Sequence, residues 1–219
     1  MKNINDEYYI ALDDYRGKTT PLHKKSEFSV FADEDLTAPI HYAMDAEYWH
    51  EGAVPKDIII DSIKGFLIKD YIKDAFFYKY NPDKIRLHPA YITSPDNETF
   101  FEGYWLAMAN SDMPSSWLDV ENSVMTMRSN PKPNKCPYLD IDKFQLNTKV
   151  LEKVPLEDRL FFTLDHNAYN NLSFIVHETL VEALRKTPNT DREVVFIPIS
   201  EYYKGLLIDE WLEDDVTIV

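Results

Sequence analysis

The sequence predicts an α+β protein with a mixed sheet, few helices and two related strand–helix–strand units. The first observation is that segments 65–89 and 173–198 share one pattern of apolar residues. At an offset of 108 residues (173 − 65), Phe66 aligns with Phe174. The second observation is that both segments end in an apolar run closed by a proline. Self-similarity of this kind is typical of one supersecondary unit that occurs twice. The alternative is a chance match, because only two of twelve aligned positions are identical.

The middle part of each unit has the spacing of a short amphipathic helix. Apolar residues at i, i+1, i+4 and i+5 lie on one helical face over residues 69–77, and the second unit has a similar face from Leu180 to Leu184. Each helix is expected to begin near an acid, Asp70 or Glu178, which suits the positive end of the helix dipole. A turn with Asn and Pro and a β-rich run then complete each unit.

Apolar runs outside the two units predict further strands. These runs cover residues 8–12, 57–61, 100–110 and 160–164. The third follows a turn at Ser94-Pro95-Asp96-Asn97, and its apolar continuity predicts burial on both faces. Residues 40–50 are expected to form either a short helix or an irregular aromatic segment.

The length of 219 residues suits a single α+β domain over residues 1–219. The alternative is two sub-lobes, 1–127 and 138–219, joined by a loop at 128–137. That loop contains three prolines and shows no periodicity.

The charge of the chain limits its partners. Lys and Arg total 23 against 38 Asp and Glu, so the formal net charge is −15. This charge repels a phosphate backbone, so we expect no nucleic-acid partner. It also favours electrostatic steering toward a basic protein, although solubility alone would account for it.

The sequence indicates a cytoplasmic protein. A single cysteine, Cys136, leaves no intramolecular disulfide. Residues 1–9 contain no apolar signal region, and no run approaches the roughly 18 apolar residues of a membrane span. We therefore expect no membrane partner.

Candidates for catalysis or metal binding are few. His41 and Asp45 would share the face of a helix, as metal ligands must, but His50 would not. Only five glycines occur, so no glycine-rich loop can hold phosphates. We predict no catalytic residue, no metal and no cofactor.

Two acidic segments are the candidate partner-binding residues. One surrounds a tryptophan, and tryptophan is enriched in interface hot spots. The alternative for that segment is a terminus that packs its apolar residues on the core. The nominated residues are Asp33, Glu34, Asp35, Asp209, Glu210, Trp211, Glu213, Asp214 and Asp215.

Hydrophobic residues recur with a defined spacing in 160–162, 173–176, 180–184 and 195–198, and Tyr104 to Met108 is followed by Trp117 to Ser123. In these motifs, residues 57–198 resemble a family of small bacterial immunity proteins from polymorphic toxin systems. The glycine that the family often has before the last strand is replaced here by Thr190-Asp191-Arg192. The resemblance implies binding and neutralisation of a cognate toxin, with no catalytic residues.

The function predicted is therefore immunity-type: stoichiometric binding of a toxin, which the acidity of the chain suggests is basic. One alternative is an enzyme, a hydrolase that uses clustered carboxylates or a metal held by His41, Asp45 and His50. Another is an oligomeric scaffold. The sequence does not identify the toxin, the binding surface or the oligomeric state.

Overall fold

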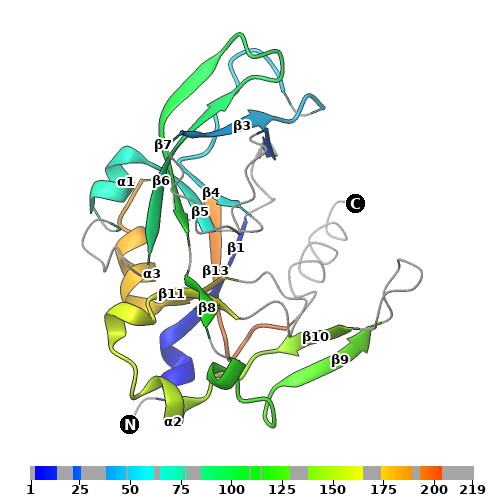
Figure 1. Cartoon of the computed structure of the whole chain (residues 1–219), viewed down its shortest axis with the longest axis vertical. Coiled ribbons are helices and arrows are strands. Elements are labelled where there is room, and N and C mark those ends of the chain that lie inside the picture. Colours follow the sequence, from blue (N-terminus) through cyan, green and yellow to red (C-terminus); the bar gives the residue numbers. More distant parts are fainter. Residues whose placement is uncertain are drawn as a thin grey trace, which may run out of the picture.

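The computed structural model shows an α+β protein, as the sequence predicts (Figure 1). It describes most of the chain in ranges separated by short gaps. These ranges are 3–13, 22–25, 38–47, 49–61, 65–75, 77, 85–108, 110–113, 115–128, 138–164, 174–188 and 193–203.

The strands of the described residues lie in three sheets. The six-stranded sheet has the order β2 (Leu22–Lys24), β3 (Ile40–Met44), β6 (Arg86–Thr93), β7 (Phe100–Met108), β5 (Gly65–Lys69) and β4 (Ile58–Asp61). The five-stranded sheet has the order β13 (Val194–Pro198), β1 (Tyr8–Asp13), β12 (Phe174–His177), β11 (Phe161–Leu164) and β8 (Asn110–Met113). The third sheet is a pair, β10 (Tyr138–Lys143) and β9 (Val124–Arg128).

Both large sheets are mixed, because β3 runs parallel to β6 and β8 runs parallel to β11. The helices among the described residues are short. They are α1 (Asp70–Ala75), α2 (Thr148–Leu151), α3 (Glu178–Leu184) and the 3-10 turns η1 (Ile4–Glu7), η3 (Ser115–Trp117) and η4 (Leu156–Asp158).

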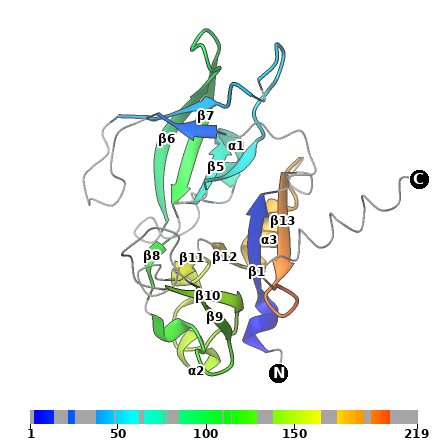
Figure 2. The same cartoon turned by 90° about the vertical axis from the view of Figure 1, so that its right-hand side faces the viewer.

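The two strand–helix–strand units are present as β5–α1–β6 and β12–α3–β13 (Figure 2). In each unit a third strand lies between the two strands of the unit and runs antiparallel to both. This central strand is β7 in the first unit and β1 in the second. An antiparallel strand also extends each sheet at the same edge, β4 beside β5 and β11 beside β12. The four-strand order is therefore the same in both halves.

The registers of the two units also match. Phe66 lies opposite Ala107 of its central strand, and Phe174 lies opposite Ala11 of the other. Both alanines are buried. The small side chain at this position lets the large ring of the neighbouring strand pack beside the centre of each sheet.

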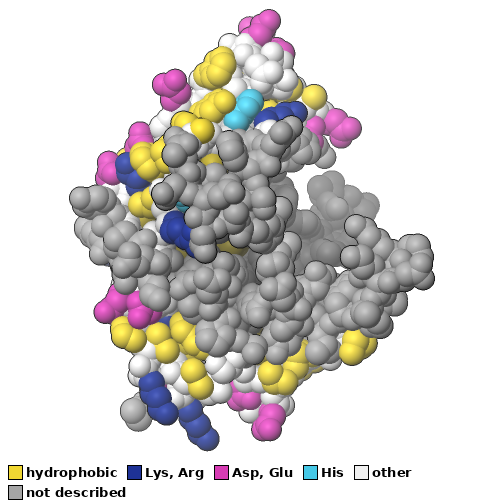
Figure 3. All heavy atoms as spheres, viewed as in Figure 1, with side chains coloured by type: hydrophobic (Ala, Val, Ile, Leu, Met, Phe, Trp, Pro, Cys, Tyr) yellow, Lys and Arg dark blue, Asp and Glu magenta, His cyan; other side chains and the backbone are white. Residues whose placement is uncertain are grey.

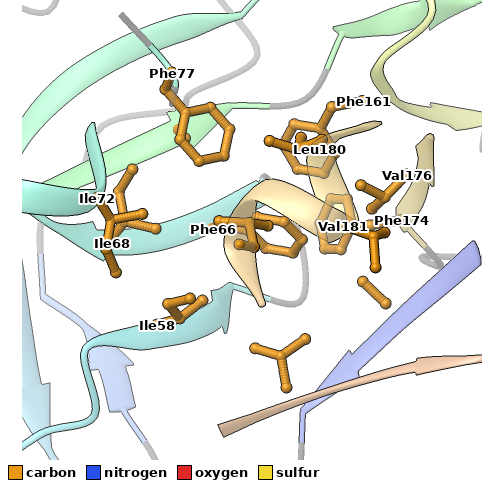
Figure 4. Packing of buried hydrophobic residues seen from close by; sticks show 14 of the residues in the cluster. Ile58, Phe66, Ile68, Ile72, Phe77, Phe161, Phe174, Val176, Leu180 and Val181 are labelled. Carbon is orange, nitrogen blue, oxygen red and sulfur yellow. The ribbon is translucent and has the colours of Figure 1, made fainter. Parts of the chain in front are cut away.

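The two units share one hydrophobic core (Figure 4). Phe66 of β5 stacks on Phe161 of β11 with 4.6 Å between ring centroids, and it meets Phe174 of β12 edge to face at 5.9 Å. Ile72 of α1 and Leu180 of α3, which stand 108 residues apart, are buried in the same cluster. Burial of these apolar side chains is the main favourable term that holds the two halves together.

The structure corrects two expectations about local structure. Residues 40–44 form strand β3 and not a helix, because they pair with β6 and bury alternate side chains on the six-stranded sheet. Strand β7 is buried on both faces only in its second half. Its first residues, including Phe100 and Glu102, are exposed.

The expected loop at 128–137 connects two paired strands, since β9 ends at Arg128 and β10 begins at Tyr138. A division into lobes at this loop, and a single domain over the whole chain, both stay predictions. Within the described ranges, no helix has the length and apolar character needed to cross a bilayer.

Candidate binding surface

Three aromatic rings form a row across neighbouring strands of the six-stranded sheet. His41 of β3 stacks on Tyr91 of β6 with 4.6 Å between ring centroids and 10° between planes. Tyr91 stacks in turn on Phe100 of β7 at 6.3 Å and 25°. We call His41, Tyr91 and Phe100 the aromatic row. Phe100 is 60% exposed, so the row ends in a large apolar ring in contact with water.

Strand alternation explains why these rings share one face of the sheet. Ile40, Tyr42 and Ile92 are buried in the cluster on the opposite face, so His41 and Tyr91 point the other way. Phe101 also belongs to that opposite cluster, which places Phe100 beside Tyr91.

A β-bulge carries this face further along β7. The register of β6 against β7 shifts between Ala90 and Ile92, and Gly103 has φ of +77°. Because of the extra residue, Glu102 and Trp105 both lie on the face of the aromatic row. A Cβ at Gly103 would lie 3.0 Å from the Asp70 carboxylate, so the close approach of α1 favours glycine there.

The turn between β6 and β7 is held by its own hydrogen bonds. The Thr99 amide donates to Ser94 Oγ at 2.9 Å, the Ser94 hydroxyl donates to the Asp96 carboxylate, and the Glu98 amide donates to Asp96 at 3.1 Å. The hydrogen bond from Ser94 and that from the Glu98 amide hold the pKa of Asp96 below its ordinary value. These hydrogen bonds fix the backbone of the turn and therefore the positions from which its side chains extend.

The aromatic row is tied to this turn through Thr93. The Thr93 hydroxyl donates to Asn97 Oδ1 at 3.0 Å, so it accepts from Nε2 of His41 at 3.0 Å. Burial lowers the pKa of His41, and the charge of Lys25 acts in the same direction. His41 is therefore an uncharged hydrogen-bond donor at neutral pH.

Exposed acids lie beside the Phe100 end of the row. They are Asp96, Glu98 and Glu102, which we call the acidic flank. The other end differs, because Lys25 lies near His41. In Figure 3, hydrophobic side chains and a histidine lie together on the upper part of the molecule, with Asp and Glu side chains at its margins.

On the same face of the sheet, closer to helix α1, a lysine of this chain lies on the ring of Trp105. The ammonium of Lys73 lies 3.8 Å from the centroid of the Trp105 ring, and the Trp105 indole N–H donates to the Asp70 carboxylate. Trp105 is only partly buried, and it packs against the shared core beside α1.

Elsewhere in the molecule, a buried glutamate links the two large sheets. Glu193, 8% exposed, precedes β13, and its carboxylate accepts the amides of Asp57 at 3.0 Å and Ile58 at 2.9 Å. Burial raises the pKa of Glu193, and the two backbone hydrogen bonds oppose this. Beside it, the Tyr71 hydroxyl donates to Asp57 at 3.0 Å. These contacts connect β4 to the other half of the molecule.

A buried network of hydrogen bonds and ring contacts surrounds Tyr8. Arg159 Nη1 donates to the Tyr8 hydroxyl at 2.6 Å, and burial raises the pKa of Tyr8 to about 12. His177 accepts the Thr179 amide at Nδ1, so its Nε2 faces the Glu7 carboxylate as a donor at 3.4 Å. The rings of Tyr8 and His177 pack edge to face at 5.0 Å. This arrangement caps α3 and holds β1 against β12.

The grouping of His41, Asp45 and His50 has a different geometry from the one expected. His41 lies on a strand, Asp45 accepts the Glu47 amide at 2.9 Å, and the His50 ring contacts the Glu51 carbonyl at 3.2 Å. In the described ranges no three His, Cys, Asp or Glu side chains come together in a way that could hold a metal ion.

All nine nominated partner-binding residues lie outside the described residues, namely Asp33, Glu34, Asp35, Asp209, Glu210, Trp211, Glu213, Asp214 and Asp215. Their role stays a prediction. The aromatic row and the acidic flank were not nominated from the sequence. The available signal was the alternation of acidic and aromatic residues through Glu98, Phe100 and Glu102 directly after a turn.

No protein-family model matches the chain, and no curated protein sequence matches it significantly.

Proposed function

We propose that this protein is an immunity-type binding protein of the bacterial cytoplasm, which neutralises a cognate toxin by forming a one-to-one complex. The toxin is a basic protein, and neutralisation occurs by occlusion of its active surface. No chemical step is needed from this chain, which is consumed stoichiometrically and does not turn over.

The observation that carries the proposal is an exposed aromatic ring beside exposed carboxylates in a chain of net charge −15. Large aromatic residues at the surface supply much of the binding energy of protein interfaces. Acids around them raise the rate at which a basic partner arrives, and this effect decreases as salt increases.

Neutralisation needs a long-lived complex with the toxin. A binding surface that is rigid before the complex forms favours such a complex. The turn of the β6–β7 hairpin is held by side-chain and backbone hydrogen bonds at Ser94, Asp96 and Thr99. A surface that is ordered before binding loses less conformational entropy when the complex forms.

The test is a protection assay in a bacterial host that lacks this system. The product of the open reading frame adjacent to the gene is expressed from an inducible promoter, with or without this chain. We expect the product alone to stop growth and co-expression to restore it. An unrelated acidic protein of similar net charge is the control for charge alone. Growth arrest that this chain does not relieve contradicts the proposal.

A further inference from the structure

We infer that the Phe100 end of the aromatic row, together with the acidic flank, is the surface that binds the partner, and that the partner places an arginine or lysine on it. The inference rests on the proposed function, because it names the surface and the chemistry of that same binding event. The occupant is a basic protein.

The exposure of the ring is the first argument. Phe100 is 60% exposed although it stands at the start of a strand whose later residues are buried. Tyr91 stacks against it with 6.3 Å between ring centroids and 25° between the ring planes, so Tyr91 supports the Phe100 ring from one side. An aromatic ring that is exposed to this extent can bind a guanidinium or ammonium group through its π face.

The same sheet shows this chemistry within the molecule. The Lys69 ammonium lies 3.9 Å from the centroid of the Tyr104 ring, and the Lys73 ammonium lies 3.8 Å from that of Trp105. Both rings belong to β7, as does Phe100. Over the part of the chain that the structure describes, no Lys or Arg lies on the Phe100 ring.

Charge decides which end of the row receives the cation. Exposed Glu102 follows Phe100 by two residues on the same face of β7, and exposed Glu98 lies two residues before the strand begins. A cation placed on the Phe100 ring would therefore lie on the strand face that carries Glu102, close in sequence to a second acid. The His41 end lies near Lys25, which would repel that cation.

The experiment measures affinity by isothermal titration calorimetry with the purified product of the adjacent open reading frame. Phe100→Ala is expected to weaken binding by at least about tenfold, as interface hot spots do. Glu98→Gln combined with Glu102→Gln is expected to slow association several-fold and to reduce its dependence on salt, measured by stopped-flow fluorescence. Phe100→Lys places a positive charge on the surface and is expected to weaken binding further than Phe100→Ala.

Matched controls come from the opposite end of the molecule, where β9 and β10 lie (Figures 1 and 2). Met127 of β9 is 63% exposed, so Met127→Ala removes a similarly exposed apolar side chain. Glu152→Gln combined with Glu182→Gln removes two exposed acids elsewhere. We expect wild-type affinity and association rate for these controls. Thermal unfolding of every variant checks that its fold is intact.

The outcomes distinguish a failure of the proposed binding surface from a failure of the proposed function. Wild-type binding that Phe100→Ala and the double glutamine variant leave unchanged overturns the surface and leaves the proposed function standing. Binding weakened by Met127→Ala in place of Phe100→Ala assigns the interface to β9 and also overturns it. An adjacent product that arrests growth and is not bound by the wild-type chain overturns the proposed function itself.

Discussion

Phe66 and Phe174 occupy the same position in the two halves of the molecule, and their rings meet edge to face with 5.9 Å between centroids. Each is fully buried on the first strand of its unit. The contact between equivalent residues joins the two sheets at the centre of the shared core.

Removing one of these rings should destabilise the whole protein. We expect Phe66→Ala to lower the free energy of unfolding by about 3 to 5 kcal/mol, because it leaves a cavity between the sheets. Phe100→Ala is the matched control, since that ring is exposed, and it should change the free energy by less than about 0.5 kcal/mol. Urea unfolding followed by circular dichroism measures both. Equal losses for the two variants would contradict the assignment of the core.

Gly65 should tolerate no side chain. A Cβ at this position would lie 1.9 Å from the backbone oxygen of Ala107, so strand β5 would have to move away from β7. We expect Gly65→Ala to lower the unfolding free energy by more than about 3 kcal/mol, in the range of the large single-residue effects. Gly52→Ala is the comparison: no atom lies within 4 Å, and only the positive φ of 84° is unfavourable. A loss of about 1 to 2 kcal/mol is expected there, the cost of the left-handed conformation for a residue with a Cβ.

Glu193 should make stability depend on pH with a defined sign. Its pKa is raised in the folded state, so the folded protein binds this proton more tightly than the unfolded chain does. The contribution of Glu193 is therefore greatest below the ordinary pKa of 4.5 and is lost as the pH rises through the raised value. We expect the stability of wild type relative to Glu193→Gln to decrease across that window. Urea unfolding of both proteins at a series of pH values measures the difference, and an increase with pH contradicts the argument.

The buried hydroxyl of Tyr8 should contribute more to the free energy of unfolding than the hydroxyl of a more exposed tyrosine. Tyr8→Phe removes the acceptor of the hydrogen bond from Arg159 in a fully buried site. A loss of about 1 to 3 kcal/mol is expected, since a charged donor is left without this partner. Tyr71→Phe makes the same chemical change at a residue that is 42% exposed and should cost less than about 0.5 kcal/mol. Thermal unfolding of the two variants side by side measures the contrast.

Local patterns predicted much of the fold. The offset between residues 65–89 and 173–198 identified both strand–helix–strand units, because the equivalent residues bury the same faces in one core. The runs at 8–12, 57–61 and 160–164 each correspond to one strand, whereas the run at 100–110 covers β7 and reaches the first residue of β8, which belongs to the other large sheet.

The central strand of the second unit could not be predicted in the same way. In the first unit β7 follows β6 along the chain, whereas in the second the equivalent strand is β1 at the N-terminus. Segments 65–89 and 173–198 therefore contain neither central strand, and β1 and β7 occupy different places in chain order. The match between Tyr8 and Tyr104, each opposite the last residue of a first strand, becomes visible only through the registers.

The proposed binding surface depends on pairing between distant segments. His41 reaches Tyr91 only because β3 pairs with β6 in parallel, and the sequence around His41 gave no sign of that pairing. The bulge at Gly103 also changes which residues of β7 share a face. Charge and composition suggested the kind of partner that we propose, whereas the location of the proposed surface required the sheet.

The most direct test of the central claim is a titration of the toxin's own activity with this protein. The account predicts that the activity of the adjacent gene product falls linearly and reaches zero at one molar equivalent, because each molecule of this chain occludes one molecule of toxin. Complete loss of activity at a small fraction of an equivalent would show turnover and contradict stoichiometric binding, as would activity that persists at a large excess.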